Sequence, residues 1–382
     1  MEKHYLKTKE DTEATYPVHL YFCDDCGLTQ LIGSAPPEVL YDNYVTLSGW
    51  KNQPHVQHSI DVLKKITDLT PASSIIEIGS NDGIFLEALT QNGFPNLLGV
   101  EPALDAFKVS ESRGFKTIND FLTPDKAIEI KNEFGEFDML VSRQSLEHIS
   151  DLSGMMKAFN LLVKKDGYVL IEVPDFSNNL DNKDYGLWEE HVNQFTLETL
   201  RYFSNLAGFE LIHEEKILFS GRILFVVGKK IADVKAPKDF IPSLKQQNLD
   251  YATSWPVFTK ELEAYLSEQK SNGKTIAVYG ASSRVFCLLN FSGLSKYIDV
   301  ILEDHPGKQN QVMPGGRIQI VPGTELYNGK IDICLLAVNT ENEDAVIAKH
   351  AKWVEQGGKF YSVLPPSEKL LPFWQKMASA KP

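Results

Sequence analysis

The spacing of apolar positions changes several times along the chain, and the changes mark alternating strands and helices. Short runs rich in Ile, Leu and Val, typical of buried strands, occur at 73–78, 96–101, 137–142 and 167–174. Longer amphipathic segments, including 82–91 and 103–113, separate these runs. This alternation predicts a parallel, doubly wound α/β sheet, which we place within 66–232.

A second α/β pattern follows the first. Residues 209–217 and 222–230 read as a strand pair that closes the first sheet, and the polar, proline-containing stretch 229–243 marks a boundary. A long helical pattern then leads into "KTIAVYGASSRVFCLLNF", which again has the order strand, glycine turn, helix. We therefore expect three parts: an irregular module at 1–65, an α/β domain at 66–232, and a helix with a second α/β domain at 233–382.

Composition excludes several classes of protein. The 382 residues are too many for one ordinary core, and 38 basic against 51 acidic residues give a formal charge of −13. Such an acidic surface argues against nucleic-acid and anionic-membrane partners. The N-terminus lacks the apolar core of a signal peptide, and Cys287 and Cys334 lie in apolar surroundings. Reduced thiols in a cytoplasmic protein are the expectation.

The glycine loop "EIGSNDG" is the first candidate for chemistry. Glu77 and Gly79 end a predicted strand, and Gly83 opens a helix, so the loop backbone could approach a ligand closely. Dinucleotide folds prefer G-x-G-x-x-G, because pyrophosphate presses against the backbone. The spacing here is G-x-x-x-G beside an acid, which suits the cationic S-adenosylmethionine better than a dinucleotide. A glycine turn that binds nothing is the alternative.

The next strand end adds to this pattern. Glu101, followed by Pro102, could accept both ribose hydroxyls of a nucleoside. Asn119 and Asp120 stand where the edge of an adenine ring would lie, and Asn81 lies within the glycine loop itself. The combination of strand, loop, helix and a strand ending in Glu is more specific than the loop alone.

Two histidines follow predicted strand ends of the same domain. In "SRQSLEHISD", Gln144 can face the cofactor and His148 can face a substrate, since open α/β sheets bind ligands at that edge. In "GLWEEHVNQFT", Glu189 and Glu190 precede His191, and an adjacent acid can orient an imidazole base. The alternative for each of these residues is that it lies on the surface or contributes only to packing.

These motifs, in this order, resemble the three-domain sugar C-methyltransferases. The resemblance covers most of the chain and extends to "YPVHLYFCDDCGLTQL", "VYGASSRVFCLLN" and "KQNQVMPGGRIQIV". It implies a class I methyltransferase domain and a second, Rossmann-like C-terminal domain that helps to bind substrate. It also implies methyl transfer from S-adenosylmethionine to a nucleotide-linked 4-keto-deoxysugar, usually at C3, in deoxysugar biosynthesis.

The resemblance also assigns roles to residues. Glu190 and His191 match the family's acid–base pair, His148 matches a second active-site histidine, and Tyr44 matches an aromatic lid residue. Trp188 stands where the family has a tyrosine, so a phenolic role in proton transfer does not carry over to this chain. We expect His191 to be the base, with His148 as the alternative base or as a donor to the O4 oxyanion.

Relatives bind structural zinc with two Cys-x-x-Cys pairs, and this chain departs from that pattern. It has only Cys23 and Cys26, and His4 and His19 have no spacing that completes a site. A remnant half-site without metal is the expectation. Three cations are candidates for the diphosphate: Arg222, Arg284 and Lys308.

Other functions stay open at the level of sequence. A nicotinamide-dependent oxidoreductase with two Rossmann domains is one, although "VYGASSRV" carries only one glycine of the fingerprint. A non-catalytic methyltransferase-like binding protein is another, supported by Trp188 and the missing zinc ligands. An O- or N-methyltransferase fits the sugar-binding last domain less well.

Overall fold

The chain forms two compact units in the computed structural model, which describes residues 5–36, 53, 55–219 and 221–379. We name each unit after its main sheet. The seven-stranded unit comprises Val18–Phe176 and Glu190–Leu244. The five-stranded unit comprises Met1–Pro17, Ser177–Glu189 and Lys245–Pro382.

This division differs from the three consecutive parts that the sequence predicts. The N-terminal segment is divided between the two units, because its strands and bridges pair with distant residues. Strand β2 (Thr29–Ile32) pairs with β8 (Asn193–Gln194), which joins the N-terminal hairpin to the seven-stranded unit. Leu6 forms an antiparallel bridge with Val312, which joins the first described residues to the five-stranded unit.

The seven-stranded sheet contains every strand predicted for the first domain. Its order is β5-β4-β3-β6-β7-β10-β9, parallel from β5 to β7, with β10 antiparallel to both β7 and β9. The predicted closing pair is thereby confirmed. The strands are β3 (Ser74–Ile78), β4 (Asn96–Val100), β5 (Thr117–Ile118), β6 (Phe137–Arg143), β7 (Val163–Pro174), β9 (Phe209–Leu218) and β10 (Arg222–Lys230).

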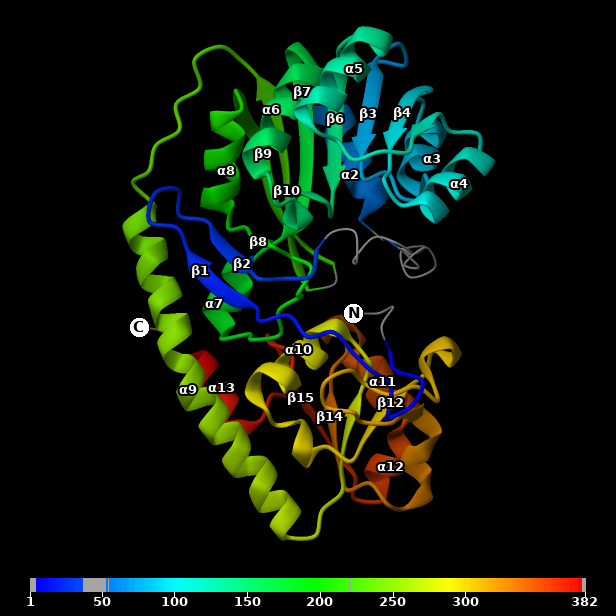
Figure 1. Ribbon diagram of the computed structural model, residues 1–382, viewed down its shortest axis with the longest axis vertical. Helices are drawn as coiled ribbons and strands as arrows, with labels where there is room; N and C mark the ends of the chain where they lie inside the picture. Colours follow the sequence, from blue (N-terminus) through cyan, green and yellow to red (C-terminus); the bar gives the residue numbers. More distant parts are fainter. Residues whose placement is uncertain (1–4, 37–52, 54, 220, 380–382) are drawn as a thin grey trace. The chain divides into compact units, whose positions relative to one another are not determined.

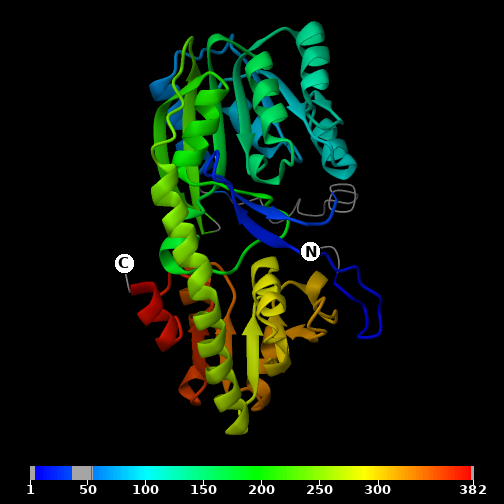
Figure 2. The same cartoon turned by 60° about the vertical axis from the view of Figure 1, so that its left-hand side comes forward.

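Helices cover both faces of this sheet (Figures 1 and 2). Successive strand residues point to opposite faces, so Ile75 packs with helices α2 and α3, while Ile76 packs with α5, α6 and α8. Both sides of the sheet are therefore buried, as expected for near-continuous apolar strands. The helices are α2 (Val56–Ile66), α3 (Ile84–Gln91), α4 (Leu104–Ser112), α5 (Pro124–Phe134), α6 (Leu152–Leu162) and α8 (Leu197–Leu206).

A small antiparallel sheet completes the seven-stranded unit. Its order is β1-β2-β8, with β1 at His19–Phe22. The turn between β1 and β2 holds Cys23 and Cys26, and the backbone N–H of Cys23 donates to the carbonyl of Leu28 at 2.9 Å. This hairpin belongs to the predicted N-terminal module, as does nearly all of helix α2.

The five-stranded unit has a wholly parallel sheet of order β13-β12-β11-β14-β15. Cys287 and Cys334 are buried, as predicted, and neither belongs to a disulfide within the described residues. The strands are β11 (Ile276–Tyr279), β12 (Val300–Glu303), β13 (Ile320–Pro322), β14 (Ile333–Leu336) and β15 (Lys359–Ser362). The helices are α7 (Ser177–Asn182), α9 (Ile241–Ser271), α10 (Ser283–Ser292), α11 (Glu343–Lys349), α12 (Ala351–Glu355) and α13 (Pro372–Ser379).

The predicted fold class is confirmed as α/β: a doubly wound sheet is followed by a second, Rossmann-like parallel sheet. Within the described ranges, none of the helices combines the length and the apolarity needed to cross a bilayer.

Candidate active site

The glycine loop lies between β3 and α3, at the carboxyl end of β3. Gly79 and Gly83 have φ angles of +71° and +80°, in the left-handed region that favours glycine. A Cβ on Gly79 would lie 2.2 Å from Oγ of Ser145, and one on Gly83 would lie 2.9 Å from the ring of Phe115. Both glycines are therefore required by the local fold, as the sequence predicts for a tight loop.

Glu77 lies on β3 directly before this loop and is 3% exposed. Its Oε2 atom is buried and has no hydrogen-bond partner. Burial raises the pKa of this carboxyl to about 8, although the guanidinium of Arg143 opposes the rise. An unsatisfied buried carboxyl favours a cationic ligand, since pairing with a cation would recover the cost of its desolvation.

Glu101 connects the end of β4 to the loop. Its Oε2 accepts from the backbone N–H of Asn81, and its Oε1 accepts from that of Ala103, each at 2.8 Å. Burial raises the pKa of Glu101 to about 6, although these two N–H groups oppose the rise. Each carboxylate oxygen keeps a second lone pair, so Glu101 can hold the loop and still accept a ligand hydroxyl.

A cavity of about 420 Å³ opens beside the loop. It is large enough for a nucleoside-sized ligand. Asn119 and Gly83 are not among its lining residues: Asn119 donates instead to the backbone carbonyls of Glu101 and Pro102, at 2.9 and 3.0 Å. The predicted residues that line it are Glu77, Gly79, Asn81, Glu101, Pro102, Asp120, Gln144 and His148.

Sequence reasoning missed the basic residue Arg143 in the cavity wall. Arg143 ends β6, is 9% exposed, and lies over the ring of Phe85 at 4.2 Å. Its Nε donates to Glu172 at 2.9 Å. Burial alone would raise the pKa of Glu172, but Arg143 and His55 hold it below its usual value. The available signal was an arginine directly after a buried strand, one residue before Gln144.

His148 lies in a short 3₁₀ turn (Leu146–His148) that follows β6. Its Nδ1 is 3.1 Å from the carbonyl oxygen of Glu190. Because a carbonyl can only accept, Nδ1 carries the hydrogen and Nε2 carries the lone pair. Burial lowers the pKa of His148, although Glu190 opposes the shift. A neutral imidazole with a defined tautomer therefore lines the cavity.

His191 stands beside His148 in the seven-stranded unit. The two rings meet edge to face, with centroids 4.8 Å apart. Asn193 fixes the backbone on both sides of His148, because its Nδ2 donates to the carbonyls of Leu146 and Ile149 at 3.2 and 2.7 Å. The structure thus brings together two histidines that are 43 positions apart in the sequence.

Other predicted site residues have different surroundings. Glu190 belongs to the seven-stranded unit with His191, whereas Trp188 and Glu189 belong to the five-stranded unit. There Glu189 accepts from the thiol of Cys287 at 3.2 Å. Tyr44 lies outside the described residues.

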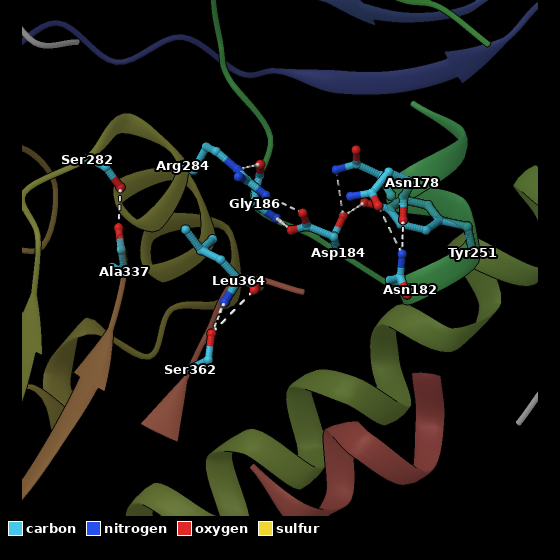
Figure 3. Close-up of polar contacts among 11 residues, drawn as sticks. Asn178, Asn182, Asp184, Gly186, Tyr251, Ser282, Arg284, Ala337, Ser362 and Leu364 are labelled. Carbon is cyan, nitrogen blue, oxygen red and sulfur yellow. Dashed lines mark hydrogen bonds and ion pairs between the residues drawn. The ribbon is translucent and has the colours of Figure 1, made fainter. Parts of the chain in front are cut away.

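Each candidate cation for the diphosphate has a partner in its own unit. Arg284 points toward Asp184 and Gly186 (Figure 3), where it forms an ion pair with the fully buried Asp184 carboxylate and donates to the Gly186 carbonyl at 2.9 Å. Lys308 donates to a backbone carbonyl at 3.1 Å. Arg222 donates to Asp175 at 2.6 Å, within the seven-stranded unit. An anionic ligand would have to compete with these contacts.

The two cysteines of the N-terminal hairpin remain a half-site. Burial alone would raise the pKa of the Cys23 thiol, but backbone N–H groups of Cys26 and Asp25 hold it below its usual value. Burial raises the pKa of Cys26 to about 11. The chain's other two cysteines are buried in the five-stranded unit, so a four-cysteine zinc site is not supported.

Two family models match the chain. A model described as "Methyltransferase domain" matches residues 42–214, and a model described as "C-methyltransferase C-terminal domain" matches residues 245–365. The first spans the glycine loop, the cavity and both histidines. The second coincides with most of the five-stranded unit.

Curated relatives agree with these models. The C-methyltransferase NovU of Streptomyces niveus is 27% identical over 369 residues, which is 92% of this chain and 87% of the relative. The EEF1A lysine methyltransferase 2 of Mus musculus is 30% identical over 161 residues, which is 39% of this chain and 59% of that protein. The likeness to the second relative is therefore confined to part of each chain.

The cavity with its glycine loop, the two domain models and the near full-length likeness to NovU agree with one another. Over most of its length the chain is therefore similar to C-methyltransferases, and its seven-stranded unit has the class I methyltransferase fold.

Proposed function

We propose that the protein transfers a methyl group from S-adenosylmethionine to a carbon, C3, of a nucleotide-linked 4-keto-deoxysugar. The observation that carries the proposal is the imidazole pair beside the cavity: His148 lines the cavity and His191 packs against it at 4.8 Å. Methylation of carbon requires a base that removes a C–H proton, and imidazole is suited to that task near neutral pH. The likeness to C-methyltransferases supports the same reading.

The cavity residues fit the methyl donor. Glu77 offers an unsatisfied buried carboxyl to a cationic group, and Glu101 offers two lone pairs to ribose hydroxyls. Asp120, Phe121 and Leu122 also line the cavity, and we assign the adenine ring to them. When bound, S-adenosylmethionine supplies an electrophilic methyl on sulfur.

The keto group at C4 acidifies the proton on C3. In our assignment His191 accepts this proton and the adjacent Glu190 orients the ring, which leaves an enolate as the nucleophile. His148 is the alternative base, because its tautomer makes Nε2 an acceptor. That tautomer does not favour the role of oxyanion donor. Tyr44 as a lid, Trp188 in the substrate pocket, and Arg222, Arg284 and Lys308 as diphosphate partners stay predictions.

The test separates proton removal from methyl transfer. With S-adenosylhomocysteine bound in D₂O, the parent protein should exchange the C3 proton of the correct nucleotide 4-keto-6-deoxysugar, measured by mass spectrometry across a panel of such sugars. With S-adenosylmethionine the product should gain one methyl group.

His191→Ala should abolish both exchange and turnover while leaving calorimetric affinity for S-adenosylmethionine nearly intact. Near-normal exchange in this variant would transfer the base role to another residue. Retention of NADH, with no heat of binding for S-adenosylmethionine, would replace the methyltransferase proposal with the oxidoreductase alternative.

A further inference from the structure

One carboxylate and two imidazoles gather next to the cavity. A ligand-type atom from each of Glu147, His148 and His191 lies within 4.8 Å of the other two. Oε1 of Glu147 is 4.0 Å from Nε2 of His148, a separation too long for a hydrogen bond. The methyltransferase chemistry proposed above uses the two histidines and leaves Glu147 without a role.

Glu147 is unusual among the buried acids. It is 1% exposed, and neither carboxylate oxygen has a hydrogen-bond partner. By contrast, the buried Glu172 pairs with Arg143 and contacts His55. An unpaired buried carboxylate is costly unless a proton or a cation compensates for its lost hydration.

His148 is already oriented as a ligand. Its Nδ1–H points at the carbonyl oxygen of Glu190, so the Nε2 lone pair is the one that faces Glu147. Histidines that bind metals commonly donate their other ring N–H to a backbone carbonyl in this way. Asn193 fixes the segment on either side of His148 through the carbonyls of Leu146 and Ile149.

We propose that Glu147, His148 and His191 form a binding site for a divalent first-row transition metal. Metal bonds to nitrogen and oxygen ligands of about 2.0–2.2 Å allow ligand separations up to about 4 Å, so the three groups need to draw together by about 1 Å. Two imidazoles favour zinc, iron, nickel or copper over magnesium and calcium. Because His148 lines the cavity, an ion bound by these three residues would lie next to the ligand space.

The consequence for activity rests on the proposed function, whereas metal binding itself does not. A nitrogen lone pair that is bound to a metal cannot accept a proton. If His191 is the base, an occupied site therefore lowers turnover, and the ion acts as an inhibitor that competes with protons for the same side chains.

The test uses Co²⁺ as the probe on the chelator-treated full-length chain. Cys23→Ser/Cys26→Ser is the parent, so that thiolates do not contribute to binding. Calorimetry and visible absorption should report one equivalent of Co²⁺ bound to this parent. Glu147→Gln and His191→Asn should each weaken binding more than about tenfold. The control is His58→Asn, which changes an imidazole that is 48% exposed, and it should bind like the parent.

Absence of Co²⁺ binding in the Cys23→Ser/Cys26→Ser parent would overturn the site, as would unchanged affinity in both Glu147→Gln and His191→Asn. The activity measurement is separate. If binding is lost in these two variants but saturating Co²⁺ leaves the turnover of the Cys23→Ser/Cys26→Ser parent unchanged, the metal site stands and the assignment of His191 as base fails.

Discussion

Replacement of Gly79 by alanine tests the loop on which the cofactor proposal depends. The backbone at this position has a φ of +71°, and the added Cβ would lie 2.2 Å from Oγ of Ser145. The Ser145 hydroxyl cannot turn away without loss, because it contacts the carbonyl oxygens of Ile78 and Arg143 at 3.3 and 3.0 Å. Strain and steric overlap therefore act together.

The magnitude follows from these two effects. A left-handed alanine costs about 1–2 kcal/mol, of which about 0.4–1 kcal/mol is offset by the lower entropy of the unfolded chain. Overpacking in a tight site adds about 1–3 kcal/mol. We expect Gly79→Ala to lower the free energy of unfolding by about 2–4 kcal/mol. Displacement of the loop should also weaken S-adenosylmethionine binding more than about tenfold, since about 1.4 kcal/mol of lost binding free energy suffices.

Urea unfolding and calorimetric titration measure the two effects. Gly273→Ala is the matched control, because its φ is +74° and no atom lies within 4 Å of the added Cβ. It should cost about 1 kcal/mol and leave cofactor binding unchanged. Adding Ser145→Gly to Gly79→Ala should recover the overpacking part. If Gly79→Ala matches Gly273→Ala in both measurements, the close approach of Gly79 and Ser145 is wrong.

Two further predictions concern buried charges. Burial raises the pKa of the Glu77 carboxyl to about 8 in the cofactor-free fold, against 4.5 for an exposed glutamate. Its contribution to stability is therefore full below about pH 4.5 and is lost as the pH rises toward 8. Glu77→Gln should therefore gain stability relative to the parent across that range in urea titrations, and a difference independent of pH would contradict this. Arg284→Ala should cost about 3–5 kcal/mol, because it leaves the buried Asp184 carboxylate uncompensated, and adding Asp184→Asn should recover part of the loss. A variant that keeps its stability but shows a raised KM for the nucleotide-sugar would instead make Arg284 a substrate ligand.

Local patterns predicted the fold well because its elements follow local rules. The run around Ile75 and Ile76 is apolar on both faces, and the structure buries both in the middle of the sheet. The acid at the end of β4 does contact the loop, although Glu101 holds the loop backbone as well as facing the cavity. These features need only neighbouring strands and one turn.

The sequence could not predict features that depend on distant partners. The sequence predicts Asn119 at the edge of an adenine ring, whereas its side chain donates to the backbone carbonyls of Glu101 and Pro102. A side-chain amide can form either kind of hydrogen bond, so the sequence does not distinguish them. Arg284 follows a glycine turn, where a phosphate ligand is expected, yet its nearest anion is Asp184, 100 residues earlier in the chain. The sequence did not indicate that Glu147 is buried without a hydrogen-bond donor, because that depends on which distant groups pack around its carboxylate.

The interleaving of the two units has a practical consequence for anyone who wishes to study them separately. Because each is assembled from non-adjacent stretches of polypeptide, no single cut of the gene yields either one whole. A fragment that starts at residue 66 would lack β2, the strand that pairs with β8 just after His191. A fragment of residues 18–244 would instead keep the amino-terminal hairpin and the whole seven-stranded unit, and would carry residues 177–189 of the other unit with it.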